Sequence, residues 1–271
     1  MHYSGKTERW IRFVGAVLGS GVLAAASSAQ DRPATIEAEP NLNGIWQAFG
    51  SAHWNLEPHN AEALDDFWML GAIAAVPASL GVVEGGEIPY LPEARAERDA
   101  NRAAWPVADP EANCYLPGIP RANYMAHPFQ VFQGGGDILF AYQYASANRS
   151  VYMGERREPP IDTWMGTSNG RWDGDTLVVE TTGLNGSTWL DRSGNFAGAG
   201  ATVIERFTLI DDSHMSYAAT IENPAVFSRP WTISLTLYRH IEPDAQLLEF
   251  RCVPFSEKLL YRDVLRATAP E

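Results

Sequence analysis

The carboxylate of Glu205 is the strongest candidate for acid–base chemistry in this sequence. Glu205 lies in the stretch 202–210, where apolar and polar residues alternate as in a half-buried β-strand. Val203, Phe207 and Leu209 share its face of that strand. A carboxylate buried among such side chains must be paired, protonated or functional. A carboxyl group that keeps its proton near neutral pH suits general acid–base catalysis, and a structural glutamate paired with an arginine is the alternative.

Four further side chains could complete a catalytic site around Glu205. Arg171 or Arg206 would stabilise a developing negative charge, and Arg171 is the expected partner if Glu205 is structural. His127 could carry a second proton, because imidazole titrates near neutral pH, although a surface loop histidine is the alternative. Asp191 lies in an irregular loop, where it could act in catalysis or simply stabilise the loop.

Aromatic residues supply a candidate binding surface for a substrate. The four residues that we expect to contact it are Tyr142, Trp189, Tyr217 and Trp231. Such side chains belong to the core by default, but a barrel of lipocalin size has room for one apolar or aromatic molecule. The histidines and cysteines show no zinc-ligand spacing, and no phosphate-binding loop or GxSxG motif occurs. We therefore expect neither a metal nor a cofactor.

The elements that must position these residues are predominantly β-strands. Short runs of β periodicity are separated by turn residues, and Asp173-Gly174 predicts a two-residue type I′ hairpin turn. Sequential antiparallel strands of this number usually close into a barrel or form a sandwich. We favour an all-β antiparallel meander that closes into a lipocalin-like barrel. The expected strands are 42–47, 129–133, 138–144, 149–153, 163–172, 175–182, 202–210, 214–222, 231–238 and 246–252.

The part of the chain before these strands predicts two helices at one mouth of the barrel. Apolar residues in 60–76 recur at three- and four-residue spacing, and a charged, alanine-rich segment follows at 93–104. The first helix would cover one end of the sheet or act as a mobile lid. We therefore expect one domain over 30–271, with a helical insertion at about 59–104.

The first 29 residues have the layout of a secretory signal peptide. A basic start precedes an apolar run, 13–26, and small residues follow it. The run is too short to span a membrane comfortably, so we expect a periplasmic or secreted protein with no membrane span after signal removal. The formal net charge of the chain is −13, which disfavours nucleic acid as a partner. The sequence does not predict an oligomeric state.

Two cysteines, Cys114 and Cys252, allow only one disulfide. After export this disulfide is chemically reasonable. It would connect the loop before the first long hairpin to the last predicted strand. Two buried free thiols are the alternative.

Long sequence blocks resemble a family of exported bacterial proteins. The chief blocks are IPYLPEA (88–94), DPEANCYLPGIPR (109–121), WMGTSNGRWDGDTLVV (164–179) and TWLDRSGNF (188–196). The resemblance covers most of the chain after the signal segment, and it implies export and a β-rich fold but no particular activity. Both cysteines match the family pattern, which favours the disulfide.

The chain departs from this family pattern at several polar positions. Where members carry His-Ser-acidic after the GNF segment, this chain has Ala197, Gly198 and Ala199. It also has Gln143 in place of a glutamate and Asn223 in place of an aspartate. These departures would mean either a lost family activity or a changed pocket.

Two functional hypotheses follow from these patterns. The first is an exported, cofactor-independent enzyme that uses acid–base chemistry on a small apolar or aromatic molecule in the barrel cavity, as a lyase, isomerase, cyclase or hydrolase. The second is a non-catalytic periplasmic binding protein for a lipid or aromatic ligand. A Glu205 locked to an arginine in a filled barrel would favour the second hypothesis.

Overall fold

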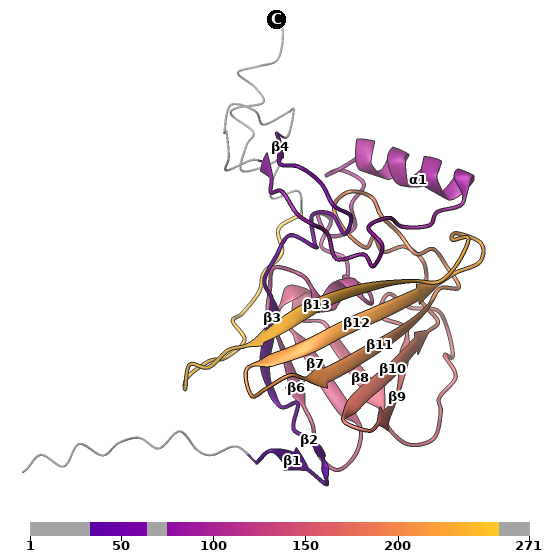
Figure 1. Ribbon diagram of the computed structural model, residues 1–271. Helices are drawn as coiled ribbons and strands as arrows, with labels where there is room; N and C mark the ends of the chain where they lie inside the picture. The colour runs from indigo at the N-terminus through magenta and orange to yellow at the C-terminus, as the bar shows by residue number, and fades with distance from the viewer. Residues whose placement is uncertain (1–32, 64–74, 255–271) are drawn as a thin grey trace, which may run out of the picture. The chain divides into compact units, whose positions relative to one another are not determined.

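A closed barrel of nine strands dominates the computed structural model, which describes residues 33–63 and 75–254 (Figure 1). The strands follow one another around the barrel in sequence order, and β13 closes on β3. The all-β barrel predicted from the sequence is therefore confirmed. The barrel strands are β3 (Gly44–Ala48), β6 (Phe129–Phe132), β7 (Ile138–Tyr142), β8 (Asn148–Tyr152), β9 (Thr167–Asp173), β10 (Thr176–Thr182), β11 (Thr202–Leu209), β12 (His214–Glu222) and β13 (Trp231–Arg239).

One pair of neighbouring strands, β8 and β9, departs from the antiparallel meander. These strands run parallel, with Val151 opposite Ser168, whereas the other neighbouring pairs of the barrel are antiparallel. An odd number of sequential strands cannot alternate in direction all the way around a closed barrel, so one parallel pair is required. The connection 153–166 is long enough to return the chain to the starting end of β8, because parallel neighbours need a crossover of about a dozen residues.

Short elements lie outside the barrel, and Figure 1 shows α1 (Pro92–Ala103) at one end and the β1–β2 pair at the other. The helix predicted at 93–104 is thus confirmed. The helix predicted at 60–76 is absent from the described ends of that range, which form short strands. Residues 64–74 lie outside the described residues. The remaining elements are β1 (Thr35–Ile36), β2 (Glu39–Pro40), β4 (Glu62–Ala63), β5 (Ala75–Val76) and the short helices η2 (Arg121–Asn123) and η3 (Tyr144–Ser146).

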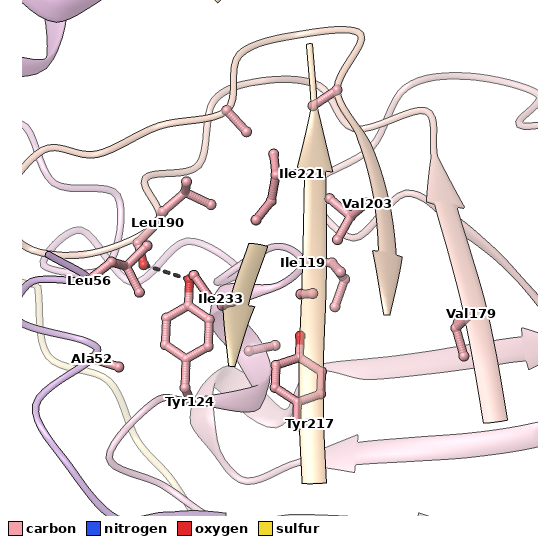
Figure 2. Packing of buried hydrophobic residues seen from close by; sticks show 14 of the residues in the cluster. Ala52, Leu56, Ile119, Tyr124, Val179, Leu190, Val203, Tyr217, Ile221 and Ile233 are labelled. Carbon is pink, nitrogen blue, oxygen red and sulfur yellow. Dashed lines mark hydrogen bonds between the residues drawn. The ribbon is translucent and has the colours of Figure 1, made fainter. Parts of the chain in front are cut away.

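The inward faces of the strands fill the barrel with large side chains. On β11 the residues Val203, Glu205 and Phe207 are buried and the residues between them are more exposed, as the alternation predicts. The ring of Phe207 lies between Phe140 and Tyr217, with centroid distances of 5.4 and 5.0 Å. Figure 2 shows part of this packing, in which aliphatic side chains surround the Tyr217 ring.

The hairpin between β9 and β10 turns one residue later than the sequence predicted. Asp173 pairs with Thr176, so the two central residues are Gly174 and Asp175. Gly174 has φ +59°. Glycine at the first central position is typical of a type II′ turn rather than type I′. The shift places Asp173 on the strand, where its side chain can reach the neighbouring strand.

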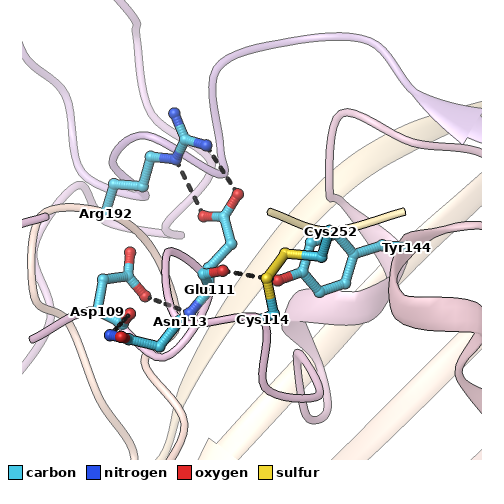
Figure 3. The surroundings of a disulfide bond; sticks show 7 residues. All are labelled: Asp109, Glu111, Asn113, Cys114, Tyr144, Arg192 and Cys252. Carbon is cyan, nitrogen blue, oxygen red and sulfur yellow. Dashed lines mark hydrogen bonds and ion pairs between the residues drawn. A yellow bond between two sulfur atoms is a disulfide. The ribbon is translucent and has the colours of Figure 1, made fainter. Parts of the chain in front are cut away.

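The predicted disulfide is present, whereas the predicted strand that would carry Cys252 is not. Cys114 and Cys252 are bonded across 138 residues of sequence (Figure 3). Residues 246–252 are irregular. They are held instead by the disulfide, by a hydrogen bond of 3.0 Å from Leu248 N to Gln143 Oε1, and by Phe250. The apolar residues of 246–252 contact the barrel end, but this segment pairs with no neighbouring strand.

Candidate functional site

Glu205 lies inside the barrel on β11 and forms an ion pair with Arg149 on β8. Both side chains are almost completely buried. The Arg149 Nη1 atom lies 3.3 Å from Glu205 Oε1, and Nη2 donates to Oε2. The guanidinium also donates to Ser168 Oγ and to Thr181 Oγ1, each at 2.8 Å. The arginine is therefore fixed by three strands besides its own.

The remaining acceptor capacity of Glu205 is used by two further donors. Asn123 Nδ2 donates to Glu205 Oε1 at 2.6 Å, and the Tyr217 hydroxyl donates to the same oxygen at 2.9 Å. Asn123 Oδ1 in turn accepts from the Tyr142 hydroxyl at 2.9 Å. A fully hydrogen-bonded buried network of this kind rigidifies a core. It holds Glu205 by four donor groups, three on Oε1 and one on Oε2, with no exposure of the side chain to solvent.

The arginine expected to partner Glu205 was wrong, because both Arg171 and Arg206 point out of the barrel. Successive side chains on a strand face opposite sides, so the neighbour of an inward Glu205 must face outward. Arg206 is exposed and donates to Asp173 at 2.8 Å. Arg171 is exposed on β9. Arg149 was missed because a lone arginine on a short strand is assigned outward by default, although its alternation with buried Val151 carried the signal.

Asp191 is completely buried and organises the loop that contains it. Its carboxylate accepts from the backbone N–H groups of Leu56, Ser193 and Asn195, at 2.8, 2.9 and 3.2 Å, and from Asn195 Nδ2 at 2.6 Å. Burial raises the pKa of Asp191 to about 6, although these hydrogen bonds oppose the rise. The geometry matches the loop-stabilising alternative, and the side chain is separate from Glu205 in the bonding network.

The other expected site residues fall into different places. Tyr142 and Tyr217 belong to the Glu205 network, as described above. Trp189 is buried, and its carbonyl oxygen lies 3.5 Å from Arg121 Nη1. Trp231 is buried against Phe227, with ring centroids 5.4 Å apart. The structure therefore does not bring the four aromatic residues together around one cavity.

His127 lies at the barrel end, half-buried between Tyr144 and Phe250. The ring centroids are 5.9 and 4.8 Å away, respectively. Burial lowers its pKa. Its ring nitrogen Nδ1 lies 3.5 Å from Gln143 Nε2, and His127 is not among the hydrogen-bond partners of Glu205 described above. The residues proposed as two proton carriers thus occupy separate environments.

A cluster of ionisable residues around Glu111 escaped the sequence reasoning. The Glu111 carboxylate accepts hydrogen bonds from Arg192 Nε at 3.0 Å and from Arg192 Nη2 at 2.8 Å (Figure 3). It also accepts one from Arg121 Nη2 at 2.6 Å. Burial favours a higher pKa for Glu111, but the two arginines outweigh it and hold the pKa at about 2. Nearby His53 has a pKa of about 4, lowered by burial and then by Arg192. The signal in the sequence was that Glu111 lies within the DPEANCYLPGIPR block.

A cavity opens in the barrel wall where β13 changes its neighbour. Residues 237–239 pair with β3, whereas Ile233 pairs with Val83 from the loop after β5. Leu235 and Thr236 lie between these two pairings and line a cavity of about 420 Å³. We call this the seam cavity. Its other lining residues are Ala48, Phe49, Gly50, Ser51, Ala52, Ala78, Ser79, Leu80, Gly81, Val82, Tyr124 and Tyr238.

The seam cavity has an apolar rim and a lining of small residues. Phe49 and Leu80 leave 66% and 95% of their surface exposed at the rim. The Phe49 ring meets the Tyr238 ring edge-on, with centroids 5.3 Å apart. Buried Tyr124 also lines the cavity, and its hydroxyl already donates to the Leu190 carbonyl at 2.9 Å (Figure 2). Such a cavity offers a small molecule apolar contact at its rim, while Ser51, Ser79 and Thr236 add polar groups to the lining.

Two findings bear on cofactors and membranes. Among the described residues, no three His, Cys, Asp or Glu side chains are grouped so that they could hold a metal ion. Within the same residues, no helix has the length and apolar character needed to cross a membrane. Comparison with known family models and with curated proteins finds no match for this chain.

Proposed function

We propose that the protein is an exported, non-catalytic binding protein whose ligand is a small apolar or aromatic molecule held in the seam cavity. The observation that carries the proposal is the cavity itself, whose volume of about 420 Å³ lies in the range of small-molecule sites. Export rests on the signal-peptide layout of residues 1–29 and is in keeping with the disulfide. Membership of the exported family is part of the same proposal.

The lining of the seam cavity supports an apolar ligand. Ala52 and Ala78 contribute only small side chains to the lining of this cavity. Phe49 and Leu80 are exposed around that space, and clustered exposed apolar groups on a soluble domain often mark a binding surface. A bound apolar molecule would remove these surfaces from water, at about 25 cal/mol for each Å² buried.

A binding role is favoured over acid–base catalysis because the carboxylate best placed for catalysis is engaged. Glu205 accepts from Arg149, Asn123 and Tyr217 at once, with its side chain fully buried. A general acid or base must lie within hydrogen-bond distance of its substrate. Bringing a substrate this close would require dismantling this network, whereas binding in the seam cavity leaves it untouched.

The neutral fluorescent probe N-phenyl-1-naphthylamine tests the proposal. Its fluorescence should rise saturably on adding the mature protein, and Ala78→Phe should weaken binding at least about tenfold by filling the cavity, a loss of about 1.4 kcal/mol. Ile210→Ala is the matched control, because Ile210 is an exposed apolar residue that does not line the cavity. Equal affinity of native protein and Ala78→Phe would reject the seam cavity as the site. If the probe binds in the seam cavity, mass spectrometry of molecules that co-purify with the protein would identify the natural ligand.

A further inference from the structure

A second cavity lies at the end of the barrel that carries the β1–β2 pair. Its volume is about 550 Å³, and it is walled by the β1–β2 turn, the glycine loop 133–137 and the ends of β8 and β9. Trp172 and Met153 give it an apolar side. Glu37, Glu39 and Arg171 give it charges of both signs. The cavity therefore combines the features of an apolar pocket and a charged one.

The cavity carries charges of opposite sign that do not form ion pairs with each other. In the described part of the chain, Arg171 is joined to neither Glu37 nor Glu39, although all three line the same hollow. Two nearby carboxylates are engaged elsewhere: Arg206 and, less strongly, Arg171 lower the pKa of Asp173, and Asp137 accepts from Met153 N at 2.9 Å and lies 4.0 Å from Arg157. The cavity can therefore offer both a cationic and an anionic side chain to one ligand.

The turn that carries Glu37 is built against its local preference. Glu37 and Ala38 are the central residues of a two-residue hairpin, and both have positive φ, +50° and +75°. Asn-Gly is the pair that suits such a turn, and other residues adopt it at a cost. Gly135 leaves room for the Glu37 side chain, because a methyl group there would overlap its carboxylate. Retained backbone strain of this kind is characteristic of binding sites.

We propose that this cavity binds a small zwitterion with an apolar body, such as a free amino acid with a large apolar side chain. The ligand carboxylate would lie on the Arg171 guanidinium, whose planar donors match a carboxylate. The ligand ammonium would lie between Glu37 and Glu39, and its apolar side chain would pack on Trp172, whose ring face also attracts cations. This site is distinct from the seam cavity, and its ligand differs in charge from the one proposed there.

Calorimetric titration with phenylalanine and two analogues tests each half of the site. Phenylalanine should bind, whereas N-acetylphenylalanine, which lacks the ammonium, and phenylalanine amide, which lacks the carboxylate, should each bind at least about tenfold more weakly, since hydrogen bonds to charged groups are worth at least that much. Low ionic strength is needed because the charges are exposed.

Variants assign each ligand charge to its protein partner. Arg171→Met should weaken phenylalanine about tenfold but leave the amide unchanged, and Glu39→Gln should weaken phenylalanine but leave the N-acetyl analogue unchanged. Arg206→Met is the matched control, because Arg206 is an exposed arginine of the outer surface that does not line this cavity. The proposal is overturned if phenylalanine gives no binding heat at millimolar concentration, if either analogue binds as well as phenylalanine, or if Arg206→Met has the same effect as Arg171→Met.

Discussion

Replacing Arg149 with methionine removes the cation inside the barrel while keeping most of the side-chain volume. Ser168 and Thr181 lose a donor, but their hydroxyl oxygens lie 2.9 Å apart and can bond to each other. The cost therefore falls on Glu205, which keeps only Asn123 and Tyr217 as donors in a fully buried position. Leaving a buried charge without its partner makes the largest unfavourable contribution to the unfolding free energy of such a variant.

The expected loss for Arg149→Met is about 3–5 kcal/mol of unfolding free energy, the usual cost of removing one partner of a buried pair. A domain of this kind has roughly 5–15 kcal/mol in total, so the variant should still fold but with a much lower denaturation midpoint. The double variant Arg149→Met/Glu205→Gln should be more stable than Arg149→Met alone. The glutamine carbonyl can still accept from Asn123 and Tyr217, and the unpaired charge is gone.

Guanidinium unfolding of the disulfide-intact proteins measures these differences, and the double-mutant cycle isolates the coupling between Arg149 and Glu205. A loss below about 1 kcal/mol for Arg149→Met, or a double variant whose loss equals the sum of the two single losses, would refute the description of a closed ion pair. Glu205→Gln that remains folded should bind N-phenyl-1-naphthylamine as the native protein does. A loss of probe binding would instead show that Glu205 contributes to the binding site.

Two further predictions concern the barrel end. Replacing Cys114 and Cys252 with serine should lower the unfolding free energy by roughly 2–5 kcal/mol, because the disulfide closes a long loop in the unfolded chain; an unchanged guanidinium midpoint would contradict this. The pKa of His53 is about 4 in the folded protein against 6.5 for the free group, so the unfolded state binds more protons at this group between these values and His53 contributes a loss of stability as pH drops from about 6.5 to about 4. Asp191, whose pKa rises from 3.8 to about 6 on folding, makes the opposite contribution over much of this range. As pH drops, His53→Phe should therefore lose less stability than the native protein, and identical pH profiles would contradict the assignment.

Local patterns in the sequence were sufficient for the nine barrel strands, though not for the irregular segment 246–252, and for the inward direction of Glu205. Alternation along β11 is a property of the strand itself, so it survives whatever the neighbours are. The partner of Glu205 depends instead on which strands meet across the barrel. Arg149 reaches it from β8, and the parallel pairing of β8 with β9 that sets this position follows from the closure of the whole barrel. The pairing of distant strands cannot be deduced from a local sequence pattern. The sequence therefore suggested Arg171, which lies next to the predicted Asp173-Gly174 turn.

The two cavities were not predictable for the same reason. The seam cavity exists because β13 pairs with β3 at one end and with the loop at Val83 at the other. The cavity at Arg171 exists because the β1–β2 turn meets the glycine loop 133–137. Both arise from contacts between segments distant in sequence. By contrast, an interior cavity was expected from composition alone, and large aromatic side chains such as Phe140 and Phe207 occupy that space.

Asn223 and the loop 197–199 hold each other in place. Asn223 Nδ2 donates to the carbonyl oxygens of Ala197 and Ala199, at 2.8 and 3.0 Å. An aspartate at this position has no donor once ionised, and would set a carboxylate against two carbonyl groups. Gly198 between them has φ +75°, which glycine adopts more readily than serine. Asn223 therefore suits the backbone conformation of this loop better than an aspartate would, and Asn223→Asp should destabilise the loop.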